Sequence, residues 1–553
     1  MTKKKTTKAK TNKIKNYLES YNFSGVVVGV LFVCLGFGPS LLPRAWFMQA
    51  VISGVLFVIG YGIGVFISYL IRQFNVKQSP KYVETLKKVT YIVLGIGYIV
   101  ALWLGFMWQE DSHRLVNIDT PPSYSVIGIT LLSGILIVVL MWIVRFVRSF
   151  FRWLRKQIDR LLPQKIANVL AIAATIFVLI GIIDGFLLNG AYSFVSTMFS
   201  TKNNTTPAGV ERQNIPTVSG SDESLISWDS LGLQGRKFIS NVTTTSELES
   251  FSKASSLPPI RIYSGLETAE DVNARAELAA KDLVRAGGFD RDVVVVVTTT
   301  GTGWVDEQGV DPIEYMYNGN SAIVSMQYSY LPSWISFLVD KQKAKDAGIA
   351  LYNAVYKEWV KLPVESRPKL LSYGESLGSF GSEAAFPAVT SLQALSSGTV
   401  WVGPPNSNEL WSNIVNHRDK GTPMVLPVYQ NGEVVRFAGK SGDLQNPETE
   451  WTFPRAVYLQ HASDPIVWWS PSLLLNKPAW YNEPRGYDVN VATRWFPIIT
   501  FWQISADMAF ANGVPDGHGH KYGTLPVDAW ANVAAPASWT IEQTAALKEQ
   551  LSQ

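Results

Sequence analysis

The sequence contains very little cysteine and histidine, and its share of charged residues is low. One cysteine, Cys34, occurs among 553 residues, which excludes a framework of internal disulfides. Charged residues make up 17% of the chain, below the roughly 25% usual for soluble domains. The formal net charge of +4 is small for this length and argues against a nucleic-acid-binding protein. With 47% hydrophobic residues, the chain is also too apolar to be intrinsically disordered.

Long apolar runs are concentrated in the N-terminal third of the chain. Each reaches the roughly 20 residues that a helix needs to cross about 30 Å of hydrocarbon. Such runs in series predict a membrane domain over residues 23–195, after a basic cytoplasmic N-terminus at 1–22. The five predicted transmembrane helices are Phe23–Leu42, Phe47–Ile71, Val89–Trp108, Ser125–Val144 and Ala167–Leu188.

Basic residues between these runs predict the orientation of the membrane domain. Seven lysines precede the first run, five Lys or Arg lie between the second and third, and seven lie between the fourth and fifth. The intervening connections on the other side hold only Arg44 and Arg114. Because cytoplasmic loops retain positive charge, we predict a cytoplasmic N-terminus and an extracytoplasmic C-terminal part.

The rest of the chain changes character twice. Residues 196–256 are rich in Ser, Thr, Asn and Gly and are predicted to be a linker and docking segment. Residues 257–553 alternate short apolar runs with helical patterns, which predicts a mostly parallel sheet with helices on both faces. Helices are expected at Ala269–Ala286, with Thr268 as N-cap, and at Ala344–Leu362. The predicted strands are Ile260–Tyr263, Val293–Val297, Ala322–Met326, Leu370–Tyr373, Val400–Val402 and Ala456–Leu459.

The motif Gly374-Glu375-Ser376-Leu377-Gly378 has the form G-x-S-x-G. It follows a predicted strand and precedes a helix-forming run of small residues, which is the setting of a nucleophile elbow. We therefore predict Ser376 to be a nucleophile. The backbone N–H of Leu377 is predicted to be one donor to the oxyanion that forms when the serine attacks a carbonyl.

A serine hydroxyl is a weak nucleophile and needs a base. Of the five histidines, His518 and His520 lie in a glycine-rich stretch near the C-terminus. We favour His520 because an aromatic residue, Tyr522, follows it as it often does in hydrolases, and His518 stays the alternative. Asp464, which follows a predicted strand, is expected to orient the base. The order Ser376, Asp464, His520 is that of the α/β-hydrolases.

The loop after the run of five valines is expected to supply the second oxyanion donor. Its glycines, Gly301 and Gly303, permit backbone N–H groups to face the site, and Thr302 is our candidate. A phosphate-binding loop is the other interpretation, but the Walker lysine is missing.

The sequence resembles the predicted membrane-anchored α/β-hydrolase family of actinobacteria and other Gram-positive bacteria. The resemblance extends from the first apolar run to the C-terminus, and it implies a multi-span N-terminal module joined to a serine-hydrolase domain. It does not imply a substrate. The matching stretches are PSLLPR (Pro39–Arg44), IRIYSGL (Ile260–Leu266), GTGWVD (Gly301–Asp306), QYSYLPSW (Gln327–Trp334), SLGSFGSE (Ser376–Glu383), WVGPP (Trp401–Pro405), YLQHASDPI (Tyr458–Ile466) and GHGHKY (Gly517–Tyr522).

These observations together predict a multi-span α-helical membrane domain followed by an α/β-hydrolase domain. We expect an extracytoplasmic serine hydrolase, esterase- or lipase-like, that acts on acyl esters without metal or cofactor. Its predicted partners are the lipid bilayer and an acyl ester of the lipid or cell-envelope class, and no nucleic acid. An acyltransferase with the same triad and a non-catalytic ligand-binding protein of transport or signalling stay open. So does a metallohydrolase with the ligands His461, Asp464, His518 and His520.

Overall fold

The computed structural model describes residues 21–74, 80–160, 163–181, 197–332, 335–337 and 341–552. The chain forms two compact units, which are described separately below. The helical unit holds the N-terminal helices together with Pro471–Tyr481 and Tyr487–Phe510. The α/β unit holds the described residues from 197 onward that do not belong to the helical unit.

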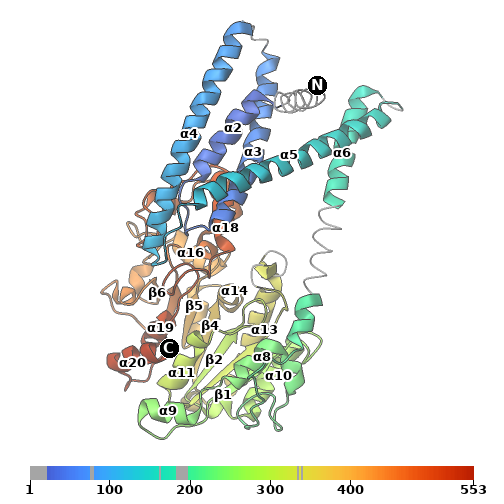
Figure 1. Cartoon of the computed structure of the whole chain (residues 1–553). Coiled ribbons are helices and arrows are strands. Elements are labelled where there is room, and N and C mark those ends of the chain that lie inside the picture. Colours follow the sequence, from blue (N-terminus) through green and yellow to red (C-terminus); the bar gives the residue numbers. More distant parts are fainter. Residues whose placement is uncertain are drawn as a thin grey trace. The chain divides into compact units, whose positions relative to one another are not determined.

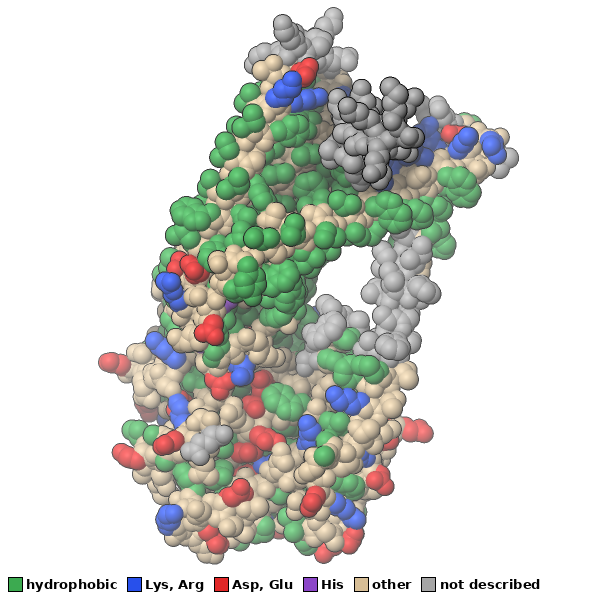
Figure 2. All heavy atoms as spheres, viewed as in Figure 1, with side chains coloured by type: hydrophobic (Ala, Val, Ile, Leu, Met, Phe, Trp, Pro, Cys, Tyr) green, Lys and Arg blue, Asp and Glu red, His purple; other side chains and the backbone are tan. Residues whose placement is uncertain are grey.

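Among the described residues, five helices make up the N-terminal part of the helical unit (Figure 1). Three of them, α3, α4 and α5, are long and apolar enough to cross a membrane. Large apolar side chains of α4, among them Ile92, Ile99 and Trp103, are more than half exposed, as expected for contact with lipid. Hydrophobic side chains dominate the visible face of these helices (Figure 2). The bounds are α2 (Phe23–Gly36), α3 (Trp46–Gln73), α4 (Pro80–Leu115), α5 (Ser125–Ile158) and α6 (Gln164–Ile180).

Two predicted spans differ from the observed helices. The run predicted as Phe23–Leu42 is helical for only 14 residues, because the chain leaves the helix ahead of Pro39, which has no N–H to continue it. The helix predicted at Ala167–Leu188 is described as far as Ile180, and the end of that prediction lies outside the described residues. The number of five spans and the orientation of the termini therefore stay predictions.

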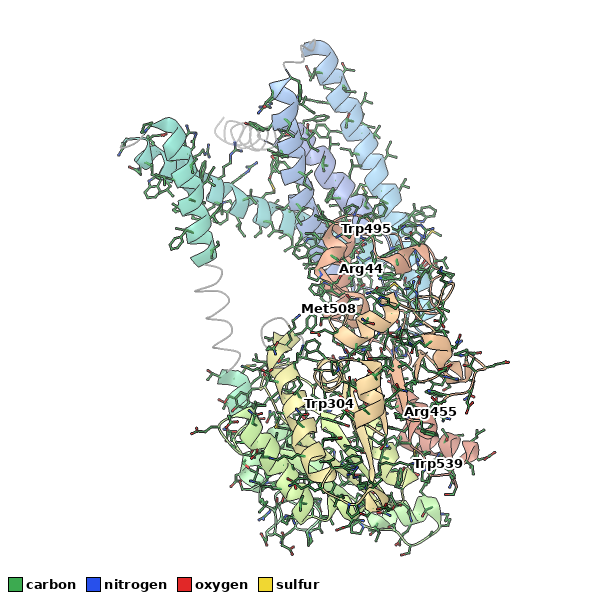
Figure 3. The ribbon with its side chains drawn as sticks, turned by 180° about the vertical axis from the view of Figure 1, so that it is seen from behind. Arg44, Trp304, Arg455, Trp495, Met508 and Trp539 are labelled. Carbon is green, nitrogen blue, oxygen red and sulfur yellow. The ribbon has the colours of Figure 1, made fainter. Side chains whose placement is uncertain are left out.

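A segment from late in the sequence completes the helical unit. Helix α18 (Ile499–Met508) contacts both α2 and α3, and Ile499 packs against Ile52 and Leu56. Figure 3 labels Arg44, which follows α2, and Trp495 and Met508 of this late segment. The segment Tyr487–Phe510 lies between Asp464 and His520 in the sequence, and sequence reasoning gave no sign of this packing.

The α/β unit is built on a sheet of seven parallel strands in the order β1-β3-β2-β4-β5-β7-β6. All six predicted strands are present. A seventh, β6, was not predicted because it is a four-residue edge strand with an arginine in it. The bounds are β1 (Ile260–Ser264), β2 (Val293–Thr298), β3 (Ser321–Met326), β4 (Lys369–Glu375), β5 (Gly398–Val402), β6 (Val435–Ala438) and β7 (Arg455–Leu459).

Helices cover both faces of this sheet. Helices α10 (Val272–Arg285), α13 (Lys341–Trp359) and α14 (Leu377–Glu383) form one layer, while α11 (Glu307–Met316) and α19 (Leu525–Val533) pack together in the other. This is the arrangement that right-handed crossovers between parallel strands produce. Further helices of the unit are α8 (Gly232–Ser240), α9 (Thr245–Ser252), α15 (Val389–Leu395), α16 (Glu409–Asn416), α17 (Pro465–Trp468) and α20 (Ile541–Leu551).

The first helix after β1 starts later than predicted. Its N-cap is Asp271 rather than Thr268, and the Asp271 carboxylate accepts hydrogen bonds from the N–H groups of Asn273 and Ala274. Thr268 instead hydrogen-bonds Ser264 and the carbonyl of Gly265, closing a turn after β1. The helix predicted at 344–362 is α13, shifted by three residues toward the N-terminus.

Candidate active site

Ser376 occupies a sharp turn between β4 and α14. Its backbone has φ 54° and ψ −125°, a combination that a residue with a side chain rarely adopts. Two glycines make the turn sterically feasible. A Cβ on Gly374 would lie 2.3 Å from the carbonyl oxygen of Gly378, and one on Gly378 would lie 2.3 Å from that of Thr298. The turn therefore has the geometry that the G-x-S-x-G motif predicts, with Ser376 at its apex.

His520 and Asp464 are hydrogen-bonded to each other. The Nδ1 atom of His520 lies 2.7 Å from Oδ2 of Asp464, and both side chains are buried. Asp464 follows β7 and is the N-cap of α17, where its Oδ1 accepts the N–H of Ile466 at 2.8 Å. The structure thus places His520, rather than His518, on the predicted acid. His518 lies in the same loop, where it forms an isolated bridge with Lys521.

The register of the sheet places the glycine that supports His520 beside the serine. Glu375 pairs with Val402, and the Ser376 N–H donates to the Val402 carbonyl at 2.8 Å, so Gly403 is the neighbour of Ser376. A Cβ on Gly403 would lie 2.4 Å from Cε1 of His520, which means that the imidazole rests on this glycine. Adjacent strands are about 4.8 Å apart, so Gly403, on which the ring rests, lies about one strand spacing from the serine. Nε2 of His520 is buried without a hydrogen-bond partner among the described residues.

The two predicted oxyanion donors lie in separate elements. Leu377 is the first residue of α14, and Thr302 lies in the turn after β2. Within the described part of the chain, neither backbone N–H has a hydrogen-bond acceptor, so both are available to a ligand. A helix N-terminus also favours negative charge at the Leu377 position.

Two residues that sequence reasoning missed hold the turn around Thr302. Gln327 is fully buried, and its Nε2 donates to the carbonyl of Thr302 at 2.8 Å. The hydroxyl of Tyr263 donates to the carbonyl of Gly303 at 2.6 Å. Both come from the ends of neighbouring strands, β3 and β1, which is the signal that could have indicated them.

A further group of carboxyl residues lies next to the serine. Burial, followed by the charge of Asp306, raises the pKa of Glu375 well above its ordinary range. Burial also raises the pKa of Asp306 to about 6, although a hydrogen bond with Glu375 opposes this rise. A protonated Glu375 that donates to Asp306 explains both directions. The sequence did not indicate this pair, because Glu375 occupies a variable position of the motif.

Two other features bear on the choice of site. In the described portion of the chain, no three His, Cys, Asp or Glu side chains are grouped to hold a metal ion.

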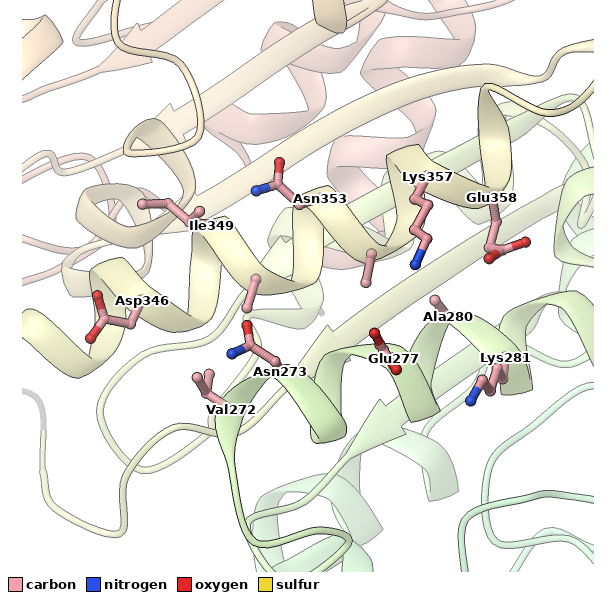
Figure 4. A pocket seen from close by; sticks show the side chains of 12 residues that line it. Val272, Asn273, Glu277, Ala280, Lys281, Asp346, Ile349, Asn353, Lys357 and Glu358 are labelled. Atoms are coloured by element: carbon pink, nitrogen blue, oxygen red, sulfur yellow. The ribbon is translucent and has the colours of Figure 1, made fainter.

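A groove of about 720 Å³ runs between α10 and α13. Alanines such as Ala280 line it, and Glu277 and Lys357 face each other across it (Figure 4). It lies against the helix layer rather than at the Ser376 turn, so we do not assign it to the chemistry.

A parallel sheet with a strained serine turn, a buried histidine–carboxylate pair and helices on both faces defines the α/β-hydrolase class of proteins. Comparison with known families leads to the same class. Residues 260–547 match the model of an alpha/beta-hydrolase family, and residues 37–242 match the model of the N-terminal region of such a family. The chain belongs to this alpha/beta-hydrolase family. No curated protein and no solved structure matches it.

Proposed function

We propose that the protein is a membrane-anchored serine hydrolase that cleaves acyl esters. The observation that carries this proposal is the arrangement of the three side chains at the carboxyl edge of the sheet. Ser376 lies in a strained turn, and His520 rests on the glycine beside it. Asp464 lies 2.7 Å behind the imidazole.

The proposed reaction begins when Nε2 of His520 takes the proton of the Ser376 hydroxyl. The serine oxygen attacks the ester carbonyl, and the negative charge that forms on the carbonyl oxygen is bound by the N–H groups of Leu377 and Thr302. Asp464 holds the imidazole in the tautomer that leaves Nε2 free to accept, and it stabilises the imidazolium that follows.

The intermediate then collapses. His520 returns the proton to the departing alcohol, and the acyl group stays on Ser376. Water then attacks the acyl carbon while His520 takes its proton, and His520 returns this proton to the Ser376 oxygen as the carboxylic acid leaves. Transfer of the acyl group to an alcohol instead of water would make the protein an acyltransferase, and product analysis separates the two.

The substrate is proposed to carry an apolar acyl chain, of the lipid or cell-envelope class. A group of aromatic side chains begins at Phe380, which lies one helical turn beyond Ser376 on α14. Lys341 lies with its ammonium 6.0 Å from the ring of Phe380 and 5.8 Å from that of Phe337, which contacts Trp469 edge-on. This apolar surface with one cation favours an acyl chain next to a polar or anionic head group.

Hydrolysis of p-nitrophenyl esters by the full-length protein in detergent tests the chemistry. We expect Ser376→Ala to lose activity by a factor on the order of 10⁴ or more, and His520→Ala to lose a similar amount. His417→Ala is the matched control, because His417 is exposed and caps α16, and it should retain activity. Activity that survives in Ser376→Ala and disappears with a chelator would instead support a metallohydrolase.

The extracytoplasmic location is a separate part of the proposal. It rests on the distribution of Lys and Arg between the apolar runs. Labelling of intact cells with a membrane-impermeant fluorophosphonate tests it. We expect labelling of the wild type on intact cells and none of Ser376→Ala. Labelling that requires permeabilised cells would reverse the orientation without affecting the chemistry.

A further inference from the structure

The carboxylate of Asp464 receives a second side-chain hydrogen bond besides that of His520. The hydroxyl of Tyr522 donates to Oδ2 at 2.7 Å, the same oxygen and the same distance as Nδ1 of His520. The other oxygen, Oδ1, accepts the N–H of Ile466. Two donors therefore share the negative charge of the oxygen that faces the imidazole.

The ring of Tyr522 is held firmly in this position. It is 4% exposed and stacks on His461, with ring centroids 4.2 Å apart and planes at 10°. It meets His520 edge-on at 5.9 Å and 82°. Its hydroxyl oxygen also accepts the backbone N–H of His461 at 3.3 Å, while the one hydroxyl proton is donated to Asp464.

The turn that carries Asp464 and the turn that carries His520 are bonded to each other directly. Nδ1 of His461 lies 2.9 Å from the carbonyl oxygen of Gly519, so it carries the proton that it donates there. The N–H of Gly519 donates to the Ser463 hydroxyl at 2.8 Å. Tyr522 therefore lies where these two turns, more than 50 residues apart in the sequence, are hydrogen-bonded to each other. Tyr522 itself is 58 residues from Asp464.

We propose that Tyr522 is a positioning residue of the site, whose hydroxyl fixes Oδ2 of Asp464 and limits how strongly this carboxylate stabilises the protonated imidazole of His520. This inference rests on the proposed hydrolase function. A carboxylate oxygen that accepts two donors offers less negative charge to each of them. The hydroxyl would then keep His520 readier to release its proton to the leaving alcohol.

Other titratable groups lie around the site and are the same in the wild type and in Tyr522→Phe. Glu375 faces Asp464 and Tyr522 from the end of β4, and Asp306 faces Glu375 from the N-cap of α11. In the loop that carries His520, Asp516 forms an ion pair with Lys521 at the surface. The neighbouring histidines are His461, in the turn that carries Asp464, and His518, in the turn that carries His520.

Tyr522→Phe in the full-length protein tests the proposal, because it removes the hydroxyl and keeps the ring that stacks on His461. The rate of fluorophosphonate labelling at Ser376 is measured from about pH 5 to pH 9. On the acidic limb of this profile, the labelling rate falls as His520 becomes protonated. Without the hydroxyl, Asp464 stabilises the imidazolium more strongly, so the midpoint of this acidic limb moves to higher pH. We expect labelling near neutral pH to slow by a factor on the order of ten.

Tyr317→Phe is the matched control. Tyr317 is also buried, and its hydroxyl donates to the carbonyl of Ala534 at 2.6 Å. It therefore loses one buried hydrogen bond away from the three side chains of the site, and its acidic limb should match that of the wild type. A limb in Tyr522→Phe that also matches the wild type would assign Tyr522 a purely structural role and overturn the proposal.

A second substitution covers the case in which Tyr522→Phe does not fold. A 3-fluorotyrosine at position 522 keeps the size of the ring and makes the hydroxyl a stronger donor, so the acidic limb should move to lower pH. An unchanged or opposite movement overturns the proposal. Failure of the proposed function is recognised separately, since then Ser376→Ala is labelled like the wild type, or the wild type is not labelled at Ser376 at all.

Discussion

At the scale of the residue, the site depends on backbone positions where a side chain has no room. Ser376 adopts a left-handed φ, and the neighbouring glycines let β4, α14 and the end of β2 approach each other closely. The motif predicted this turn from sequence because glycine at both positions has a direct steric cause. The donors to the acid, Tyr522 above all, could not be predicted, since no local pattern states which carboxylate a tyrosine reaches.

Gly378→Ala tests this steric argument. The new Cβ would lie 2.3 Å from the carbonyl oxygen of Thr298, so the backbone of the turn must shift. We expect a loss of stability of about 1–3 kcal/mol and a labelling rate reduced at least tenfold. The control is Gly97→Ala in α4, where a Cβ meets nothing within 4 Å. Normal labelling of Gly378→Ala would show that the turn is not as tight as described.

Glu383 predicts a pH dependence of stability. Burial raises its pKa from 4.5 to about 7, against the opposing hydrogen bonds of Asn408, Tyr458, Leu410 and Trp411. A raised pKa means that the folded state binds the proton more tightly than the unfolded state. The contribution of this group is therefore complete below about pH 4.5 and is lost as the pH rises through about 7.

The size of this effect is on the order of 3 kcal/mol across the window. Thermal unfolding in detergent between these pH values measures it, and Glu383→Gln, which does not titrate, should flatten the dependence. An equally steep decline in stability in Glu383→Gln would assign the pH dependence to another group.

At the scale of the element, the structure joins the connection between α2 and α3 to a helix from late in the sequence. Asp507 of α18 accepts hydrogen bonds from the Ser40 hydroxyl at 2.9 Å and the Leu41 N–H at 3.0 Å. Arg44 lies 3.9 Å from the same carboxylate, and both side chains are buried. Gln503 donates to the carbonyl of Gly38 at 2.9 Å. The stretch Pro39–Arg44 thus forms a binding surface for α18.

Asp507→Ala should destabilise the protein strongly. It removes the carboxylate beside the buried guanidinium of Arg44 and the acceptor of the Ser40 and Leu41 hydrogen bonds. The loss of one member of a buried ion pair costs about 3–5 kcal/mol. Glu84→Ala is the control, because Glu84 pairs with Lys88 at the surface of α4 and such pairs contribute less than about 1 kcal/mol. Thermal unfolding in detergent compares the two. Equal, small losses would mean that the buried network does not stabilise the fold.

The elements themselves were largely predictable from sequence, and their long-range partners were not. Runs such as Val293–Val297 are apolar on every side, which marks a central parallel strand. The edge strand β6 lacks that signal, since it is short and contains Arg436. The contact between Ser40 and Asp507 joins residues 467 positions apart, and no periodicity or motif encodes such a pairing.

At the scale of the whole molecule, the division of the chain does not follow its order. Residues Tyr487–Phe510 belong to the helical unit, although the sequence on both sides of this stretch belongs to the α/β unit. The chain from Asp464 to His520 therefore passes through the helical unit. The N-terminal helices consequently have a role in completing the fold besides the anchoring that the sequence predicts.

Removal of residues 1–196 tests this role. The remaining chain would expose Ile499 and leave the Asp507 carboxylate without Ser40, Leu41 and Arg44. We expect it to aggregate on size-exclusion chromatography, and co-expression of residues 1–196 as a separate chain should restore soluble complex in detergent. A monomeric, fully labelled 197–553 fragment would show that the helices serve as an anchor alone.

The most direct test of the central claim is to map the site of fluorophosphonate labelling by mass spectrometry on the full-length protein. We predict one adduct, on the peptide that contains Ser376, which is absent in Ser376→Ala, greatly slowed in His520→Ala and unchanged in His417→Ala. An adduct on a different residue, or equal labelling of Ser376 in His520→Ala, would contradict the proposal that this serine is a nucleophile activated by His520.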